Sequence, residues 1–314
     1  MAQTITQNSN PSRQRSGGTF FTRNRHTIEA WVILTPILLY FFVFSLLPVA
    51  ANLAVSFVEW NGFNEAQWVG LDNYVRFFTT PRYIEVLTNT LFFAVVILAA
   101  SMVLGFLVAL ALNEEVRGLS LYRTMWYIPT LTSGAVMAQI ATIFIAPGSG
   151  VISGILRSLG QPELIWQIDP TFARVFIIVF SVWRGVGLSM LLYLVGLQSI
   201  PLDVIDAARV DGASGWKMIR HITVPLLRPT TVFVVVTGLI SAVQIFEPVL
   251  LITGGQPRNS TNVMMLQIYN DAFKNQNFGM AAATGTIMLL VLLWASVINM
   301  RLLQATAVEE IRGE

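Results

Sequence analysis

The sequence contains no cysteine and few charged residues among its 314 residues. Without cysteine the chain can form no disulfide, no thiolate metal site and no cysteine nucleophile, and its thiol usage says nothing about the redox compartment. Only 11% of the residues are charged and 54% are apolar, and the charged share is about half that of an ordinary soluble domain. A water-soluble fold is therefore not expected.

Motifs for catalysis are also missing. The chain has no G-x-x-x-x-G-K-[ST] phosphate-binding loop, so it has no evident means of binding ATP itself. Its two histidines, His26 and His221, lie at the margins of the apolar runs, which leaves an intramembrane hydrolase or metalloprotease without a base or a ligand. The acidic pair Glu114 and Glu115 is interpreted as a solvated charged corner. We expect no catalytic residue, metal or cofactor in this chain.

Long charge-free runs dominate what is present. A helix needs about 20 residues, at about 1.5 Å each, to cross a hydrocarbon layer of roughly 30 Å. Five runs of about that length stand out, and a sixth is interrupted only by Arg184; none shows the alternation of a strand. The expected fold is an all-α polytopic membrane protein with six transmembrane helices, at about residues 30–56, 86–112, 123–146, 173–197, 229–251 and 279–303.

Lys and Arg near the ends of these segments predict the orientation. They are more numerous on the side that holds both chain ends, so both termini are expected in the cytoplasm. We expect residues 1–28 to be a disordered cytoplasmic arm, residues 29–305 to be the transmembrane domain and residues 306–314 to be a cytoplasmic tail. The first helix is expected to be an anchor and not a removable leader.

The polar stretch 197–229, between the fourth and fifth expected helices, has structure of its own. A first short helix is expected to begin near Pro201 and to be broken by Gly212. A second short helix, which Ser214 can cap, is expected to run through about Ile222 and to be stopped by Pro225. Together they predict a rigid knuckle that protrudes into the cytoplasm.

This loop closely resembles the EAA motif of the permease subunits of binding-protein-dependent ABC importers. The matching blocks are Asp206-Ala207-Ala208, Asp211-Gly212-Ala213 and Ile222-Thr223-Val224-Pro225, with Asp206 where the family more often has Glu. Further blocks resemble the carbohydrate branch, of the maltose and glycerol-phosphate type: VGLDNYVRFF from Val69, VWRGVG from Val182, FEPVLLITGG from Phe246 and FGMAAATG from Phe278. The resemblance covers roughly residues 28–305 and implies the type I permease fold of ABC importers.

The resemblance implies that the loop couples this chain to a separate ATPase subunit. The short helix would dock in a cleft of the ATPase and transmit its closure to the membrane helices, with small residues permitting close approach and charged residues giving directional contacts. The implied coupling residues are Asp206, Ala207, Ala208, Arg209, Asp211, Gly212, Ala213 and Pro225. An amphipathic linker is the alternative, but it has no need of these blocks in this order.

Two charged residues within apolar segments point to the substrate pathway. A charge in lipid costs several kcal/mol, so Arg184 and Glu247 must face protein or water. In the fifth helix Thr237, Ser241 and Gln244 recur every three or four residues, which gives a polar stripe that suits a sugar. Packing between helices explains such a stripe equally well.

Matching along the shared motifs to maltose-type permeases implies pocket positions in the third, fourth and fifth helices. These are Thr130, Gly134, Ser181, Arg184, Gly185, Leu188, Thr237 and Ser241. Several differ in chemical type from the maltose-type residues, so the ligand is not expected to be held identically. Arg184 either contacts an anionic or hydroxyl-rich substrate or neutralises Glu247, and the sequence leaves both open.

The sequence therefore predicts a non-catalytic permease subunit of the bacterial inner membrane that imports a sugar or sugar derivative by alternating access. The resemblance implies four kinds of partner: a second homologous permease, two cytoplasmic ATPase subunits that bind ATP and Mg, and an extracytoplasmic substrate-binding protein. Pairing with a second copy of this chain stays open.

A channel or an ion-coupled secondary transporter is the alternative function, and the EAA-type loop argues against it. The balance of 19 Lys and Arg against 17 Asp and Glu gives no reason to expect nucleic acid.

Overall fold

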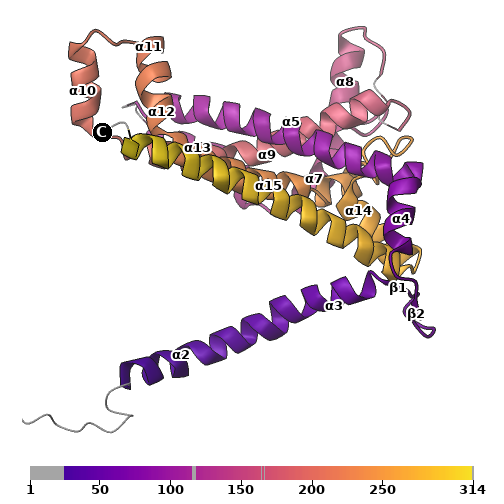
Figure 1. Ribbon diagram of the computed structural model, residues 1–314. Helices are drawn as coiled ribbons and strands as arrows, with labels where there is room; N and C mark the ends of the chain where they lie inside the picture. The colour runs from indigo at the N-terminus through magenta and orange to yellow at the C-terminus, as the bar shows by residue number, and fades with distance from the viewer. Residues whose placement is uncertain (1–24, 115–117, 164, 166, 313–314) are drawn as a thin grey trace, which may run out of the picture. The chain divides into compact units, whose positions relative to one another are not determined.

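The computed structural model describes residues 25–114, 118–163, 165 and 167–312, and this part of the chain is almost entirely helical (Figure 1). It divides into two compact units at residue 51. The first described unit consists of α2 (Arg25–Phe41), the π-helical η1 (Phe42–Leu46) and the first part of α3 (Leu47–Val55). Its large apolar side chains from Trp31 onward are exposed, as expected of a lipid-facing segment. Most of the expected arm, residues 1–24, lies outside the described residues.

The second unit is built on long helices. They are α5 (Pro81–Ala111), α9 (Pro170–Gln198), α13 (Arg228–Val243) and α15 (Phe278–Arg312), and α5 lies along α9 with α13 packed against both (Figure 1). The starts of two of them follow from local chemistry: Pro81 opens α5, and the Asp169 carboxylate accepts hydrogen bonds from the first backbone N–H groups of α9. The main buried cluster lies among these helices.

Shorter elements connect the long ones. On one side of the unit lie β1 (Val58–Glu59), β2 (Gln67–Trp68), α4 (Asp72–Thr79), α8 (Val151–Ser158), α14 (Met264–Tyr269) and η4 (Asn270–Lys274). The two strands pair antiparallel, Val58 opposite Trp68, outside the apolar runs. The remaining elements are α6 (Leu119–Leu131), α7 (Gly134–Phe144), α10 (Leu202–Val210), α11 (Trp216–Met218), η2 (Ile219–Thr223), α12 (Val224–Leu226) and η3 (Val249–Thr253).

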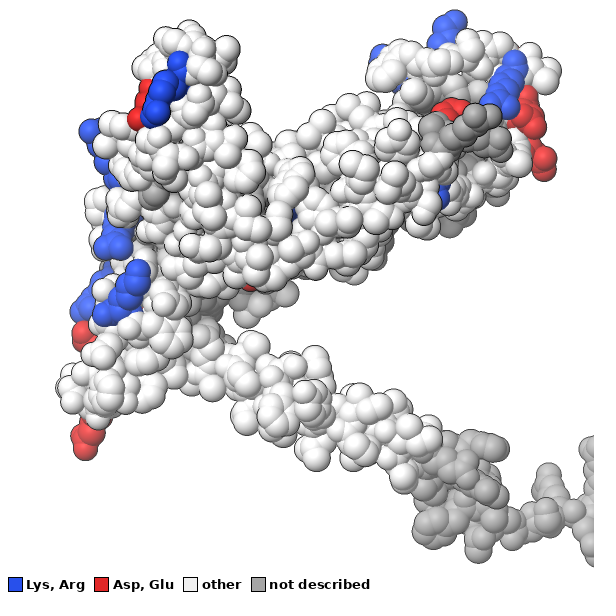
Figure 2. Space-filling model, turned by 180° about the vertical axis from the view of Figure 1, so that it is seen from behind, with Lys and Arg blue, Asp and Glu red and all other residues white. Residues whose placement is uncertain are grey.

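Among the described residues, four helices are long and apolar enough to cross a membrane: 30–55, α5, α9 and residues 278–301 of α15. Two further pairs pass together but are sharply bent, α6 with α7 by 95° and 216–226 with α13 by 69°. Counting each bent pair as one span gives six. On the face shown in Figure 2, the second unit carries its charged side chains mainly near its two ends, and the surface between them is almost free of charge.

The expected continuous third and fifth helices are wrong in detail. The third is broken between Leu131 and Gly134, and the fifth stops at Val243 before the chain turns into η3. Pro225 was expected to end a helix, yet the helical path continues past it to Leu226. The reason is the π-helical turn η2 just before it, whose widened backbone accommodates a residue without an N–H donor. The second short helix begins at Trp216, and its N-cap residue is Gly215 where Ser214 was expected.

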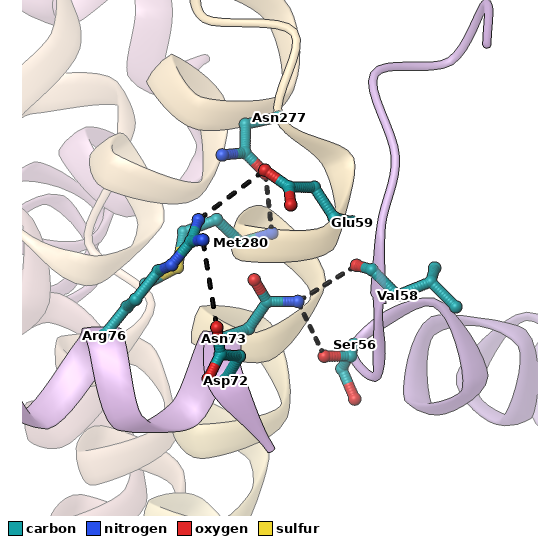
Figure 3. Close-up of polar contacts among 8 residues, drawn as sticks. All are labelled: Ser56, Val58, Glu59, Asp72, Asn73, Arg76, Asn277 and Met280. Carbon is teal, nitrogen blue, oxygen red and sulfur yellow. Dashed lines mark hydrogen bonds and ion pairs between the residues drawn. The ribbon is translucent and has the colours of Figure 1, made fainter. Parts of the chain in front are cut away.

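The VGLDNY block has a structural role at the end of the unit that carries β1 and α4. Asn73 is buried, and its Nδ2 donates to the carbonyl oxygens of Ser56 and Val58, both at 3.0 Å (Figure 3). Arg76 forms an ion pair with Glu59 at 3.6 Å. These contacts join α4 to the end of α3 and to β1.

The FGMAAATG block fixes the start of α15 against the same hairpin. The side-chain oxygen of Asn277 accepts a hydrogen bond from the backbone N–H of Met280 at 3.0 Å and so caps the helix (Figure 3). A Cβ at Gly279 would overlap the carbonyl oxygen of Val58. Glycine is therefore required for this close approach.

Candidate functional site

A cavity of about 450 Å³ lies within the second unit, between α5, α9, α13 and the chain that follows α13. Its size lies within the range of roughly 300–1,000 Å³ that is usual for small-molecule sites. Nine of the ten residues expected to bind substrate line it: Thr130, Ser181, Arg184, Gly185, Leu188, Thr237, Ser241, Gln244 and Glu247. Residues from three separate helices and the following loop thus face one space.

Arg184 lies at the break between α6 and α7. Its Nε donates to the carbonyl oxygen of Pro129 at 3.4 Å, and its Nη2 donates to that of Thr132 at 3.3 Å. These carbonyls belong to the last turn and the C-cap of α6, where a helix leaves acceptors unpaired and carries partial negative charge. The guanidinium therefore satisfies the end of one half of the broken helix.

Glu247 lies at the other half of the break. A Cβ on Gly134, the first residue of α7, would overlap Glu247 Oε2 and would lie 2.7 Å from Arg184 Nη1. Gly134, the tenth expected residue, therefore makes room for both charged groups. The carboxylate faces the positive N-terminal end of α7, an arrangement worth about 0.3–1 kcal/mol at an exposed helix end.

The guanidinium of Arg184 is held by backbone carbonyl oxygens and not by the Glu247 carboxylate. The ion pairs among the described residues do not include Arg184 with Glu247, and the guanidinium bonds to backbone carbonyls instead. Each charge is placed at the helix end of opposite sign. The bend of 95° between α6 and α7 is what creates these two ends inside the membrane segment.

The hydroxyl groups of the expected polar stripe are already engaged with backbone. Thr237 Oγ1 donates to the carbonyl oxygen of Phe233 at 2.8 Å, and Ser241 Oγ donates to that of Thr237 at 3.0 Å. Thr130 Oγ1 donates across to the carbonyl oxygen of Arg184 at 2.6 Å. These three hydroxyls offer the cavity lone pairs and no free proton donor.

Sequence reasoning missed one wall of the cavity. Ile97, Leu98 and Ser101 of α5 line it, and α5 contributed no expected site residue. The available signal was the spacing of Ser101 and Gly105, a small-xxx-small pair inside a long apolar helix. Leu188 supplies an apolar part of the opposite wall.

The loop at residues 197–229 has the expected first short helix and the elbow at Gly212. α10 ends at Val210, and Gly212 has a φ of 83°, in the left-handed region. The backbone N–H of Gly212 donates to the carbonyl oxygen of Arg209 at 3.0 Å, and that of Ala213 donates to Ala208 at 2.9 Å. This pair of bonds is a Schellman motif, which explains the need for glycine at the elbow.

The outer surface of this loop is suited to contact with another protein. A shallow groove of about 440 Å³ is lined by Asp203, Val204, Ala207, Ala208, Asp211, Ala213 and Ile222. Asp206 and Arg209 form an exposed ion pair at 3.1 Å beside it. Two large apolar side chains of α10 are exposed, Leu202 by 77% and Val210 by 88%. α10 and α11 project from one end of the second unit (Figure 1).

No group of three or more His, Cys, Asp or Glu residues that could hold a metal ion occurs within the part of the chain that the structure describes.

Comparisons with known proteins agree with this geometry. The sequence profile of the family described as "Binding-protein-dependent transport system inner membrane component" matches residues 102–307. The chain is 31% identical over 283 residues to the probable ABC transporter permease protein YurN of Bacillus subtilis, covering 88% of this chain and 97% of YurN. It is 30% identical over 274 residues to the lactose transport system permease protein LacF of Rhizobium radiobacter, covering 85% of this chain and 91% of LacF.

The fold is also shared with a solved transporter. A chain in the crystal structure of a bacterial alginate ABC transporter, in complex with an alginate pentasaccharide-bound periplasmic protein, superposes with a TM-score of 0.78 at 24% identity. The match covers 89% of this chain and 95% of that chain. The arrangement of helices is therefore that of an ABC importer permease.

Proposed function

The chain belongs to the family of binding-protein-dependent transport system inner membrane components, and we propose that it forms the translocation pathway of an ATP-driven importer for a sugar or sugar derivative. The observation that carries the proposal is the 450 Å³ cavity, which gathers nine residues that lie far apart in the sequence. Several of these nine are polar or charged, and they lie inside helices that otherwise face lipid or apolar neighbours.

A sugar fits the chemistry of this cavity. The engaged hydroxyls of Thr237 and Ser241 present acceptor lone pairs, and the Gln244 amide can both donate and accept. Phe246 adds an aromatic side chain and Arg184 a cation. The name of LacF, a lactose transport permease, and the alginate cargo of the structural neighbour support a saccharide as the substrate class.

The loop around α10 supports coupling to separate ATPase subunits. Its Schellman elbow is rigid, and its exposed apolar side chains, Leu202 and Val210, would be covered in a complex. In this proposal the ATPases bind ATP and Mg, and alternating access of this chain follows their closure. A second permease completes the cavity, and an external binding protein delivers the substrate. In this proposal both termini are cytoplasmic, because Lys and Arg are more numerous near the span ends on that side.

Co-purification tests the assembly. The tagged chain is expressed with its candidate partners in a membrane fraction, and the purified complex is analysed for an ATPase subunit and for ATP hydrolysis. We expect hydrolysis by the complex and none by the isolated chain. Loss of the ATPase from the Leu202→Asp, Val210→Asp double variant is expected, whereas Ile155→Asp in the distant α8 serves as a matched control at another exposed apolar residue. Retention of the ATPase by the double variant would contradict the assigned docking surface.

A further inference from the structure

Ser101 is a buried hydroxyl without a partner at the wall of the cavity. Its side chain is only 6% exposed, and its Oγ has no hydrogen-bond partner anywhere in the described residues. A serine inside a helix usually donates to the carbonyl one turn earlier, as Ser241 does in α13. An unpaired buried hydroxyl is unfavourable, so its presence needs an explanation.

Close packing of two helices holds Ser101 in this position. A Cβ at Gly185 of α9 would lie 2.9 Å from Ser101 Oγ, and a Cβ at Gly105 of α5 would lie 2.5 Å from Cβ of Ser189. Each serine thus faces a glycine of the opposite helix. Gly185 lines the same cavity, and the lack of a side chain at Gly185 allows α5 and α9 to approach this closely.

A second free hydroxyl lines the same cavity. Ser181 is one helical turn from Gly185, lines the cavity, and its Oγ is also without a hydrogen-bond partner among the described residues. The hydroxyls of Thr130, Thr237 and Ser241, in contrast, each donate to a backbone carbonyl. The two unpaired hydroxyls that line the cavity are therefore carried by α5 and α9.

We propose that Ser101 is a substrate-binding residue, and that its hydroxyl and that of Ser181 bind a hydroxyl or ring oxygen of the saccharide as it passes through the cavity. This inference rests on the proposed function. A sugar hydroxyl can accept from one serine and donate to another acceptor, so it uses both capacities of the group. The pair therefore selects for hydroxyl-rich cargo over apolar cargo of the same size.

The stability of a Ser101 variant distinguishes a role in substrate binding from a role in helix packing. Removing a hydroxyl that has no partner leaves the folded state unchanged or more stable, whereas removing one that supports packing or a hydrogen bond destabilises it. Ser101→Ala is therefore expected to weaken transport without lowering the unfolding temperature. Thr284→Val is the matched control, because Thr284 is fully buried, does not line the cavity, and donates only to the Met280 carbonyl.

The experiment uses the complete transporter with its partner permease, ATPases and binding protein in proteoliposomes. Import of radiolabelled lactose, maltose and sn-glycerol 3-phosphate is measured at saturating loaded binding protein, together with ATP hydrolysis and the unfolding temperature. For the imported sugar, Ser101→Ala should lower the import rate roughly 3- to 10-fold, the effect of one lost neutral hydrogen bond. ATP hydrolysis and the unfolding temperature should be retained, and Thr284→Val should import normally.

The outcomes are distinct. Normal import by Ser101→Ala in a complex whose wild type imports the sugar would overturn the inference and leave the proposed function standing. Slower import accompanied by a lower unfolding temperature would assign Ser101 to packing and overturn it as well. No import of any of the three probes by the wild-type complex would contradict the proposed function and this inference together.

Discussion

Gly134 and Glu247 lie so close together that a single methyl group on the glycine would overlap the glutamate carboxylate. This contact joins the start of α7 to the loop after α13, and the same methyl group would lie 2.7 Å from Arg184 Nη1. Two charged side chains therefore meet at one glycine, where the third membrane segment is broken. The break between α6 and α7, Gly134 and the two charged side chains therefore form one cluster.

Gly134→Ala is predicted to disrupt this cluster at the break between α6 and α7. The added Cβ must displace the Glu247 carboxylate or the start of α7, and such overpacking costs typically about 1–3 kcal/mol. We expect a lower unfolding temperature of the assembled complex and slower import. Gly154→Ala in α8 is the control, because a Cβ there meets open space, and it should be neutral or slightly stabilising. Equal behaviour of the two variants would contradict the packing described for Gly134.

Arg184→Met is predicted to impair both the break and the pathway. The variant keeps much of the side chain's bulk but leaves the carbonyl oxygens of Pro129 and Thr132 without their donors, a loss of roughly 1–3 kcal/mol. Import should fall strongly, and amide hydrogen exchange should rise at the break between α6 and α7. Arg184→Lys keeps the positive charge but lacks the planar guanidinium group. Its import rate and its hydrogen exchange at the break should therefore lie between those of the wild type and those of Arg184→Met. Unchanged exchange and import in Arg184→Met would show that the guanidinium does neither task.

Much of the fold follows from the sequence because long apolar runs must be helices in a membrane. The elbow at Gly212 was also predictable, since glycine is the residue that most readily adopts its φ of 83° after a helix. The break near Gly134 was not, because a Thr-Ser-Gly stretch bends a helix only when groups such as Arg184 and Glu247 satisfy the exposed helix ends.

The composition of the cavity was predictable only in part. The expected residues of the third, fourth and fifth helices came from a family resemblance, and the structure gathers them around one space. Their role in binding remains a prediction. Ser101 lay outside the expectation because its spacing with Gly105 marks a face for close helix packing but does not show which helix packs there. Only the packing of α5 on α9, with Gly185 opposite, shows where its hydroxyl lies.

Gly212→Val is predicted to uncouple the transporter. No atom lies within 4 Å of the position that a Cβ would take, so the harm comes from backbone strain alone, at roughly 1–2 kcal/mol for a left-handed residue with a side chain. ATP hydrolysis stimulated by the loaded binding protein should fall while membrane insertion is retained. Gly212→Asn, which tolerates this conformation, should keep most of the coupling. A Val variant that couples normally would rule out the assigned elbow.

Glu163 is predicted to make the segment around α8 sensitive to acid. The hydrogen bond from the Ser153 side chain, and then that from the Gly148 backbone N–H, lower the pKa of this exposed carboxyl below its usual 4.5. Because the pKa of Glu163 is lowered in the folded state, its ionised carboxyl contributes fully to the stability of this segment above pH 4.5. This contribution to stability is lost as the pH falls through the lowered pKa. Hydrogen exchange of residues 148–158 should therefore rise below that range. Glu163→Gln should show the raised exchange at neutral pH, and a pH-independent wild type would refute the assignment.

In the proposed function, this chain provides a saccharide pathway that is driven by ATPase subunits on separate chains. The most direct measurement is lactose uptake into proteoliposomes that hold the purified complex, with the binding protein outside and ATP inside, compared with proteoliposomes that hold this chain alone. The account predicts uptake by the complex only when ATP is present, and neither uptake nor ATP hydrolysis by the isolated chain. Uptake by the isolated chain without ATP would contradict it and would instead identify a channel or a secondary transporter.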